Sequence, residues 1–161
     1  MLKILLSDKE FMQLAIAKAR EGIKKGQTPF GACIVKKGQV VSCAYNVVWK
    51  SQDITAHAEI NCIRRACREL KTIDLSGCVI YSTCEPCPMC FSACHWAKIN
   101  KIFFGAGIRD AKKAGFNEMM ISNTHMKQHG KSHVAVTGGL LKEESLCLFE
   151  EWLQKRDKKF Y

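Results

Sequence analysis

The sequence lacks long apolar runs, internal repeats, low-complexity segments and Gly/Ser-rich linkers. Near its N-terminus, the apolar run at residues 4–6 is followed at once by Ser7 and Asp8, and it is too short for a signal peptide or a membrane span. An exported protein, a membrane protein and a repeat array are therefore not expected. The sequence favours a cytoplasmic protein that has no membrane partner.

Acidic residues are also scarce, because 15 Asp and Glu stand against 25 Lys and Arg, for a net charge of +10 at pH 7. This balance favours an acidic partner or an anionic substrate without identifying one. A hydrophobic content of 47% in 161 residues is enough for a compact core and argues against disorder. We therefore expect one domain over residues 1–161.

Cysteine is the residue type in excess, with ten in the chain. In an exported chain, so many cysteines would indicate a disulfide framework. In the reducing setting expected here, clustered cysteines more often serve metal or redox chemistry. Six of the ten cysteines are expected to be small core residues, namely Cys33, Cys62, Cys67, Cys78, Cys94 and Cys147.

Hydrophobic periodicity and turn residues predict alternating helices and strands. Ser7 and Glu10 form a capping box for a helix that ends near Gly26 and whose apolar stripe includes Leu14. Further helices are predicted over residues 56–70, 87–97 and 142–155, strands over 31–35, 40–45, 78–82, 102–106 and 133–136, and loops over 107–132. The strand–helix–strand order of residues 78–106 indicates an α/β layered domain.

The strongest chemical signal combines His57 with Cys87 and Cys90, each at the start of a predicted helix. Two thiolates and one imidazole suit zinc, and three protein ligands leave a fourth position for water, which is the catalytic pattern. The positive end of a helix stabilises the thiolate form of the two cysteines. Glu59, two residues after His57, is then close enough to shuttle the proton of that water.

The order H-x-E followed by P-C-x-x-C is the signature of zinc nucleobase deaminases. Two other interpretations use the same residues. His57 could be a core histidine, with Cys87 and Cys90 as half of a structural Cys₄ site, but no second C-x-x-C pair is suitably placed. The spacing of Cys84, Cys87, Cys90 and Cys94 also matches a ferredoxin cluster run, although His95 stands where that run has proline.

From Pro29 to the C-terminus, the sequence resembles the guanine deaminases of the cytidine deaminase-like superfamily, the bacterial group that converts guanine to xanthine. The matching segments are PFGA at 29–32, YN at 45–46, TAHAE at 55–59, CEPCPMC at 84–90, DAKKAGF at 110–116 and KKFY at 158–161. The first four are shared across the superfamily. The last two distinguish guanine deaminases from the rest of the superfamily, since these parts shape the purine pocket in that family.

The resemblance implies a three-layer α/β/α cytidine deaminase-like fold, with a central mixed five-stranded sheet and helices on both faces, and one Zn²⁺ per chain. It implies zinc-dependent hydrolytic deamination of a purine base, with guanine converted to xanthine and ammonia. The implied substrate contacts are Phe30, Asn46, Ala58, Glu118 and Tyr161. Glu118 stands where many members carry aspartate, and Asn117 where a second aspartate is usual.

The resemblance also implies that the C-terminal tail, about residues 156–161, closes the active site with Tyr161. In relatives the tail does so across a swapped dimer, so we expect a homodimer. From the residues alone, the default assignments are a core aromatic for Phe30, a turn residue for Asn46, a loop carboxylate for Glu118 and a frayed terminus for Tyr161.

Other functions share the zinc motif. A tRNA-specific adenosine deaminase would explain the charge of +10 through phosphate contacts, and IFFGA at 102–106 resembles that group. Against it, the tail ends in tyrosine instead of an arginine-rich helix, so nucleic acid is the less favoured partner. Guanosine or another aminopurine nucleoside is a further possible substrate, and a non-enzymatic, RNA-binding zinc module is a third class.

Two other groups of residues are assigned structural roles. His125, His129 and His133 recur every four residues, but Gly130 and Ser132 interrupt a helix there, so we expect a loop with exposed histidines and no second metal site. The tryptophans are expected in the core or at a dimer interface; they are Trp49, Trp96 and Trp152.

Overall fold

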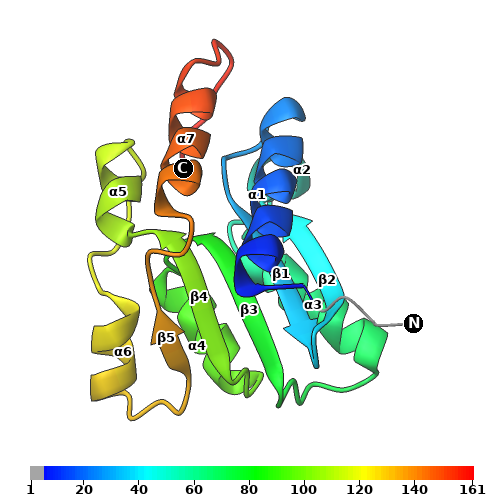
Figure 1. Cartoon of the computed structure of the whole chain (residues 1–161). Helices are drawn as coiled ribbons and strands as arrows, with labels where there is room; N and C mark the ends of the chain where they lie inside the picture. Colours follow the sequence, from blue (N-terminus) through cyan, green and yellow to red (C-terminus); the bar gives the residue numbers. More distant parts are fainter. Residues whose placement is uncertain (1–5) are drawn as a thin grey trace.

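A single five-stranded sheet organises the molecule, which a computed structural model describes over residues 6–161 (Figure 1). Most of the apolar run at residues 4–6 lies outside these described residues. The strand order is β2-β1-β3-β4-β5. The strands are β1 (Gly31–Lys36), β2 (Gln39–Tyr45), β3 (Cys78–Cys84), β4 (Lys101–Ala106) and β5 (Ala135–Thr137).

The sheet is mixed, as predicted. β1 pairs antiparallel with both β2 and β3, whereas β3, β4 and β5 run parallel. β1 and β2 form a hairpin whose two turn residues, Lys37 and Gly38, have φ values of 51° and 71°. Positive φ at both positions is the geometry that matches the twist of a two-residue hairpin, and glycine adopts it without steric cost.

Helices cover both faces of the sheet, which confirms the three-layer fold (Figure 1). α1 (Asp8–Lys24) and α7 (Lys142–Leu153) pack on one face, while α3 (Ala58–Leu70) and α4 (Pro88–Trp96) pack on the other. Strand alternation divides the core accordingly: Tyr81 belongs to the cluster under α1 and α7, and Ile80 to the cluster under α3 and α4.

The capping box that predicted α1 is present, since the Ser7 hydroxyl accepts from the Glu10 amide and the Glu10 carboxylate accepts from the Ser7 amide. The predicted stripe was wrong at Leu14, which is 36% exposed. Met12 and Ile16 are buried in its place. The buried face of α1 is therefore slightly rotated about the helix axis relative to the predicted one.

Three short helices were not predicted: α2 (Val48–Ser51), and, within the predicted loops, α5 (Ile108–Lys113) and α6 (Asn123–His129). The prediction of loops over 107–132 was therefore partly wrong. Ser122 caps α6 by accepting from the His125 amide, and the helix ends before Gly130. Six- and seven-residue helices carry too little periodicity to be recognised in the sequence.

The predicted burial of cysteines and tryptophans held only in part. Cys147 lies on the exposed side of α7, and Cys67 is only half-buried. Trp152 is fully buried, whereas Trp96 is 81% exposed at the end of α4. Within residues 6–161, no helix is both long and apolar enough to cross a membrane.

Candidate metal centre and active site

The three predicted ligands lie together where α3 and α4 begin. His57 is the residue that precedes the first turn of α3, Cys87 has the same place in α4, and Cys90 lies one turn further on. The Nδ1 atom of His57 is 3.7 Å from the Cys87 sulfur and 3.6 Å from the Cys90 sulfur. All three donor atoms lie within 4.8 Å of one another.

These spacings fit zinc. With Zn–S bonds of about 2.3 Å and Zn–N bonds of about 2.0–2.1 Å, tetrahedral geometry places neighbouring donor atoms roughly 3.6 Å apart. Within the described part of the chain, no fourth His, Cys, Asp or Glu joins this group. The site therefore suits one zinc ion with three protein ligands and one open position.

The electrostatics of the centre favour the thiolate form at Cys87, whereas the hydrogen bond to Cys87 and burial raise the pKa of Cys90. A hydrogen bond from Cys90 and the proximity of His57 lower the pKa of Cys87 to about 4, although burial acts in the opposite direction. Both cysteines also lie at the N-terminal end of α4, where the free amides attract negative charge. Zinc binds the thiolate form of cysteine, so this environment prepares the site for the metal.

Glu59 lies beside the ligand group without belonging to it. Its side chain is buried, and its Oε1 atom accepts a hydrogen bond of 2.9 Å from Ser82 Oγ. Its Oε2 atom lies 3.5 Å from the Cys90 sulfur. Burial raises the pKa of Glu59. The carboxyl group is thus fixed at one oxygen, directed at the metal centre by the other, and more easily protonated than a surface glutamate.

A cavity of about 310 Å³ opens next to the ligands. Its lining residues are Ile54, His57, Cys87, Pro88, Met89, Phe116, Asn117, Glu118, Met119 and Tyr161. A narrower recess continues from it to Phe30 and Glu59. Burial raises the pKa of Glu118 to about 7. The cavity therefore combines an aromatic wall with a carboxyl group and ends at the metal ligands.

Of the five residues implied as substrate contacts, Phe30, Glu118 and Tyr161 line this space, whereas Asn46 and Ala58 are not among its lining residues. Phe30 packs edge-on against Phe116, with ring centroids 4.8 Å apart, and borders the recess. Asn46 is fully buried, and Ala58 is the first residue of α3, next to His57. Glu118 and Tyr161 border both the cavity and the recess.

The last residue of the chain, Tyr161, lines the cavity. The Tyr161 hydroxyl accepts a hydrogen bond of 2.6 Å from Asn46 Nδ2, and its ring centroid is 5.6 Å from that of His57. Phe160 packs against Trp152, and Trp49 Nε1 donates to the Lys159 carbonyl at 3.1 Å. Three consecutive tail residues are thereby attached to the body of the molecule.

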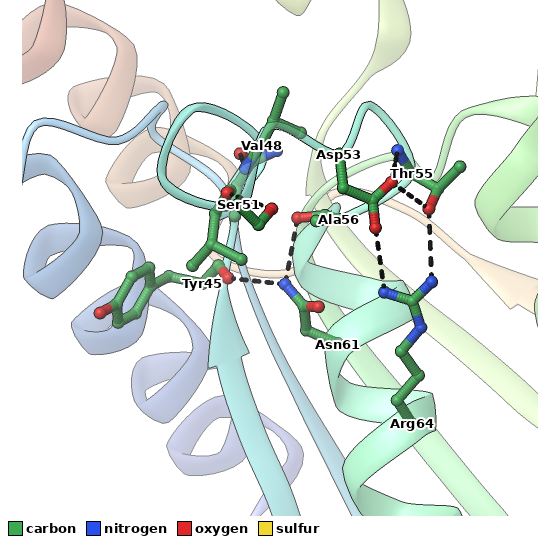
Figure 2. Close-up of polar contacts among 10 residues, drawn as sticks. Tyr45, Val48, Ser51, Asp53, Thr55, Ala56, Asn61 and Arg64 are labelled. Atoms are coloured by element: carbon green, nitrogen blue, oxygen red, sulfur yellow. Dashed lines mark hydrogen bonds and ion pairs between the residues drawn. The ribbon is translucent and has the colours of Figure 1, made fainter.

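The loop that leads into His57 is braced by polar contacts (Figure 2). Asp53 Oδ1 accepts from the Thr55 amide at 2.8 Å and from the Thr55 hydroxyl at 2.6 Å. Arg64, one turn and a half along α3, contacts both residues. Asn61 Nδ2 donates to the carbonyls of Tyr45 and Ala56, so it ties the end of β2 to this loop. The position of His57 is therefore fixed by residues on its own helix.

Two residues that sequence reasoning missed fix the cysteine loop. The Glu85 carboxylate accepts from the amides of Ile108 and Asn123, at 3.1 Å and 2.8 Å. The buried Asn123 donates through Nδ2 to the Pro86 carbonyl at 2.6 Å. Glu85 had a signal, because it lies inside the CEPC motif, but Asn123 had none, because its partners are distant in sequence.

The competing metal assignments do not match the arrangement. Cys84 packs in the core cluster under α1, whereas Cys94 packs in the cluster on the opposite face. The four cysteines of the ferredoxin-like run therefore do not converge. His125 and His129 stack on α6 with centroids 3.9 Å apart, and His133 lies against His95. Among residues 6–161, His57, Cys87 and Cys90 form the one group of three suited to a metal.

A His/Cys/Cys zinc site with a buried, non-ligating glutamate, built on helix starts over a mixed sheet, defines the class of zinc-dependent hydrolytic deaminases. Residues 6–106 match the cytidine and deoxycytidylate deaminase zinc-binding region. The chain belongs to this family, whose members are hydrolases that act on C–N bonds.

Individual relatives cover nearly the whole chain. It is 37% identical to the guanine deaminase of Bacillus subtilis (strain 168) over 97% of its own length and 100% of that protein. It is 34% identical to the tRNA-specific adenosine deaminase of the same organism, over 94% and 93%. The solved structure of the guanine deaminase from Nitrosomonas europaea superposes with a TM-score of 0.86 at 27% identity, covering 95% of this chain and 88% of that one.

Proposed function

We propose that this protein hydrolyses guanine to xanthine and ammonia. The observation that carries the proposal is the size of the cavity beside the metal ligands. This cavity, lined by Glu118 and Tyr161 among others, has a volume of about 310 Å³. A space of this size accepts a small ligand such as a free base. The full-length similarity to a guanine deaminase supports the same substrate.

Zinc, when bound by His57, Cys87 and Cys90, supplies Lewis-acid activation of water at neutral pH. Glu59 performs the proton transfers. Its Oε1 atom is occupied by Ser82, so Oε2 accepts the proton of the attacking water. The protonated carboxyl then delivers this proton to the ring nitrogen, accepts a second proton from the hydroxyl group added to the ring carbon, and delivers that second proton to the departing amine. The raised pKa of Glu59 suits a group that must alternate between both forms.

The remaining residues position the base. Phe30 packs against the purine ring, and Asn46 Nδ2 donates its second N–H to the base while its first N–H keeps the bond to the Tyr161 hydroxyl. The Ala58 amide is one of the first amides of α3, which have no acceptor within the helix, and it donates to a base oxygen or nitrogen. Glu118 accepts from a ring N–H on the outer edge. Tyr161 covers the bound base.

We further propose that residues 1–161 act as one deaminase domain, in which the tail at about residues 156–161 opens and closes the site. The predicted homodimer belongs to this proposal, and in its tail-exchanged form the tail of each subunit makes on the other subunit the contacts that Lys159 and Tyr161 make within one chain. Light scattering of the zinc-loaded protein would give the mass of one dimer. If each tail instead closed the site of its own subunit, the protein would also be recovered as a monomer at low concentration, with undiminished activity per chain.

The test is ammonia release from a panel of substrates: guanine, guanosine, cytosine, cytidine, adenine and a tRNA anticodon stem-loop. Zinc-loaded protein should act on guanine with the highest kcat/KM. The matched control is Glu59→Gln at the same zinc content, which removes enzymatic release and reveals contamination. A panel in which guanine gives no more ammonia than this control contradicts the proposal.

A tRNA-specific adenosine deaminase is the second candidate. It is favoured by the 34% identity to such an enzyme over 94% of the chain, and by the net charge of +10. For this activity the tail must leave the cavity to admit a nucleotide of the loop. Inosine formation in the stem-loop would establish it, whereas faster reaction of guanosine than guanine would establish a nucleoside deaminase.

A further inference from the structure

A second pair of cysteines makes direct contact on the face of the sheet opposite to α3 and α4, the helices that carry the metal ligands. Cys33 of β1 and Cys43 of β2 are directly opposed in the antiparallel ladder, and their sulfur atoms are 2.9 Å apart. Cys33 is fully buried against α1, whereas Cys43 is half-buried on the strand at the edge of the sheet. The deamination chemistry uses neither thiol.

We propose that Cys33 and Cys43 form a reversible cross-strand disulfide when the protein meets a peroxide. Directly opposed residues of an antiparallel pair have Cα atoms about 4.5–5.5 Å apart. Disulfides span Cα separations of about 4.4–6.8 Å. The two sulfur atoms can therefore bond with little movement of the backbone.

Cys43 is the thiol that reacts first. It is the more exposed of the two, and the positive charges of Lys18 and Arg65 lie nearby. The hydrogen bond with Cys33 and these two charges lower the pKa of Cys43, while the same contact and burial raise the pKa of Cys33. A half-exposed thiolate backed by a buried thiol is the arrangement of a peroxide-sensitive cysteine with a resolving partner.

The reaction balances with hydrogen peroxide as the oxidant. The Cys43 thiolate attacks one peroxide oxygen, the O–O bond breaks, and hydroxide leaves and is protonated to water. The resulting sulfenic acid is attacked at sulfur by Cys33, the S–O bond breaks, and a second water leaves. In sum, two thiols are oxidised by two electrons to a disulfide while one peroxide is reduced to two waters.

The other cysteines provide internal comparisons. Cys147 is exposed and should oxidise or alkylate readily without forming this link. Cys62 is buried on the opposite face of the sheet and contacts the Ala32 carbonyl at 3.1 Å. Burial raises the pKa of Cys62 and should leave it unreactive in the folded protein.

The experiment exposes zinc-loaded, full-length protein to low concentrations of hydrogen peroxide, blocks remaining thiols by alkylation after unfolding, and maps tryptic peptides without reduction. Lys36 and Lys37 lie between the two cysteines, so trypsin separates them and the link joins two peptides. We expect a linked pair that contains Cys33 and Cys43, lighter by two hydrogens, which dithiothreitol separates. Zinc content should remain unchanged at this dose.

Variants make the outcome specific. In Cys33→Ala, the linked pair should vanish and Cys43 should accumulate as sulfenic acid that dimedone traps, whereas Cys62→Ala should leave the link intact. Recovery of both alkylated thiols at a dose that oxidises Cys147 overturns the proposal, as does linkage of Cys43 to another cysteine. The mapping requires no deaminase activity, so its result is independent of the proposed substrate.

Discussion

The metal side and the substrate side of the active site are built in different ways. On the metal side, His57, Cys87 and Cys90 come from two short motifs, each at the start of a helix. On the substrate side, Glu118 follows α5 and Tyr161 is the last residue of the chain. Local sequence thus determines the chemistry, whereas the choice of substrate depends on segments that only tertiary packing brings together.

The two sides also differ in solvent exposure. Glu59 and Cys90 are buried, while the outer rim of the cavity carries Ile54 and Met119, both 62% exposed. A buried polar group must keep its partners, so the metal side tolerates little change. The rim has no such constraint, and we expect mutations there to alter KM or substrate preference before they alter turnover.

The largest effect is expected from a ligand substitution. Cys87→Ser should lose both zinc and activity, because a hydroxyl is a poor zinc ligand at neutral pH. Metal content by elemental analysis should fall well below one ion per chain, and ammonia release should be undetectable. The matched control is Cys147→Ser, which is exposed and should retain both. Full zinc occupancy in Cys87→Ser would remove this residue from the ligand set.

Next in size is Glu59→Gln, which separates metal binding from proton transfer. Zinc content should be unchanged because Glu59 lies outside the ligand group, while kcat should fall by about 10³–10⁴-fold. Ser82→Ala removes only the hydrogen bond to Oε1 and should cost about tenfold. Turnover of Glu59→Gln within about tenfold of the wild type would contradict its assigned role.

Removal of residues 156–161 tests the substrate side as a whole. The truncation exposes the cavity and removes the packing of Phe160 and Tyr161. The apolar burial that is lost with these two side chains contributes roughly 2–3 kcal/mol. We expect kcat/KM for guanine to fall on the order of 100-fold, mainly through KM, with zinc retained. Lys158→Ala, which leaves the aromatic residues in place, serves as the control. Unchanged KM in the truncated protein would separate the tail from substrate binding.

The smallest effect is expected from Tyr161→Phe, which keeps the ring and removes the hydroxyl that accepts from Asn46. A neutral hydrogen bond contributes about 1 kcal/mol, so kcat/KM should fall about fivefold. Steady-state kinetics of this variant and the truncation then separate the ring from the hydroxyl. Equal losses in the two would assign the whole contribution of the tail to this single bond.

Much of the fold was readable from sequence because its signals are local. The capping box of Ser7 and Glu10, the hairpin turn at Gly38 and the apolar runs predicted α1 and all five strands within two residues of their observed ends. The failures have a common cause. α5 and α6 are short. The start of α6 is also held by contacts of Asn123 with Glu85 and Pro86, which are 38 and 37 residues away in the sequence.

The aromatic residues show the same limit. Trp152 and Trp96 have the same side chain, yet Trp152, within α7, is fully buried and Trp96, at the end of α4, is exposed. Composition could not separate them, because the difference lies in which helix face meets the sheet. Leu14 was misassigned for a related reason, since a small rotation of α1 exchanges one apolar residue for another.

The sequence by itself determined the family, the zinc ligands and the glutamate beside them, because ligand spacing and helix starts are properties of a few adjacent residues. Only the tertiary structure decided which side chains enclose the cavity, how Ser82 fixes Glu59 and Glu85 fixes the cysteine loop, and that two thiols on neighbouring strands touch. These contacts join residues far apart in the chain, and packing of the two helical layers on the sheet sets their distances.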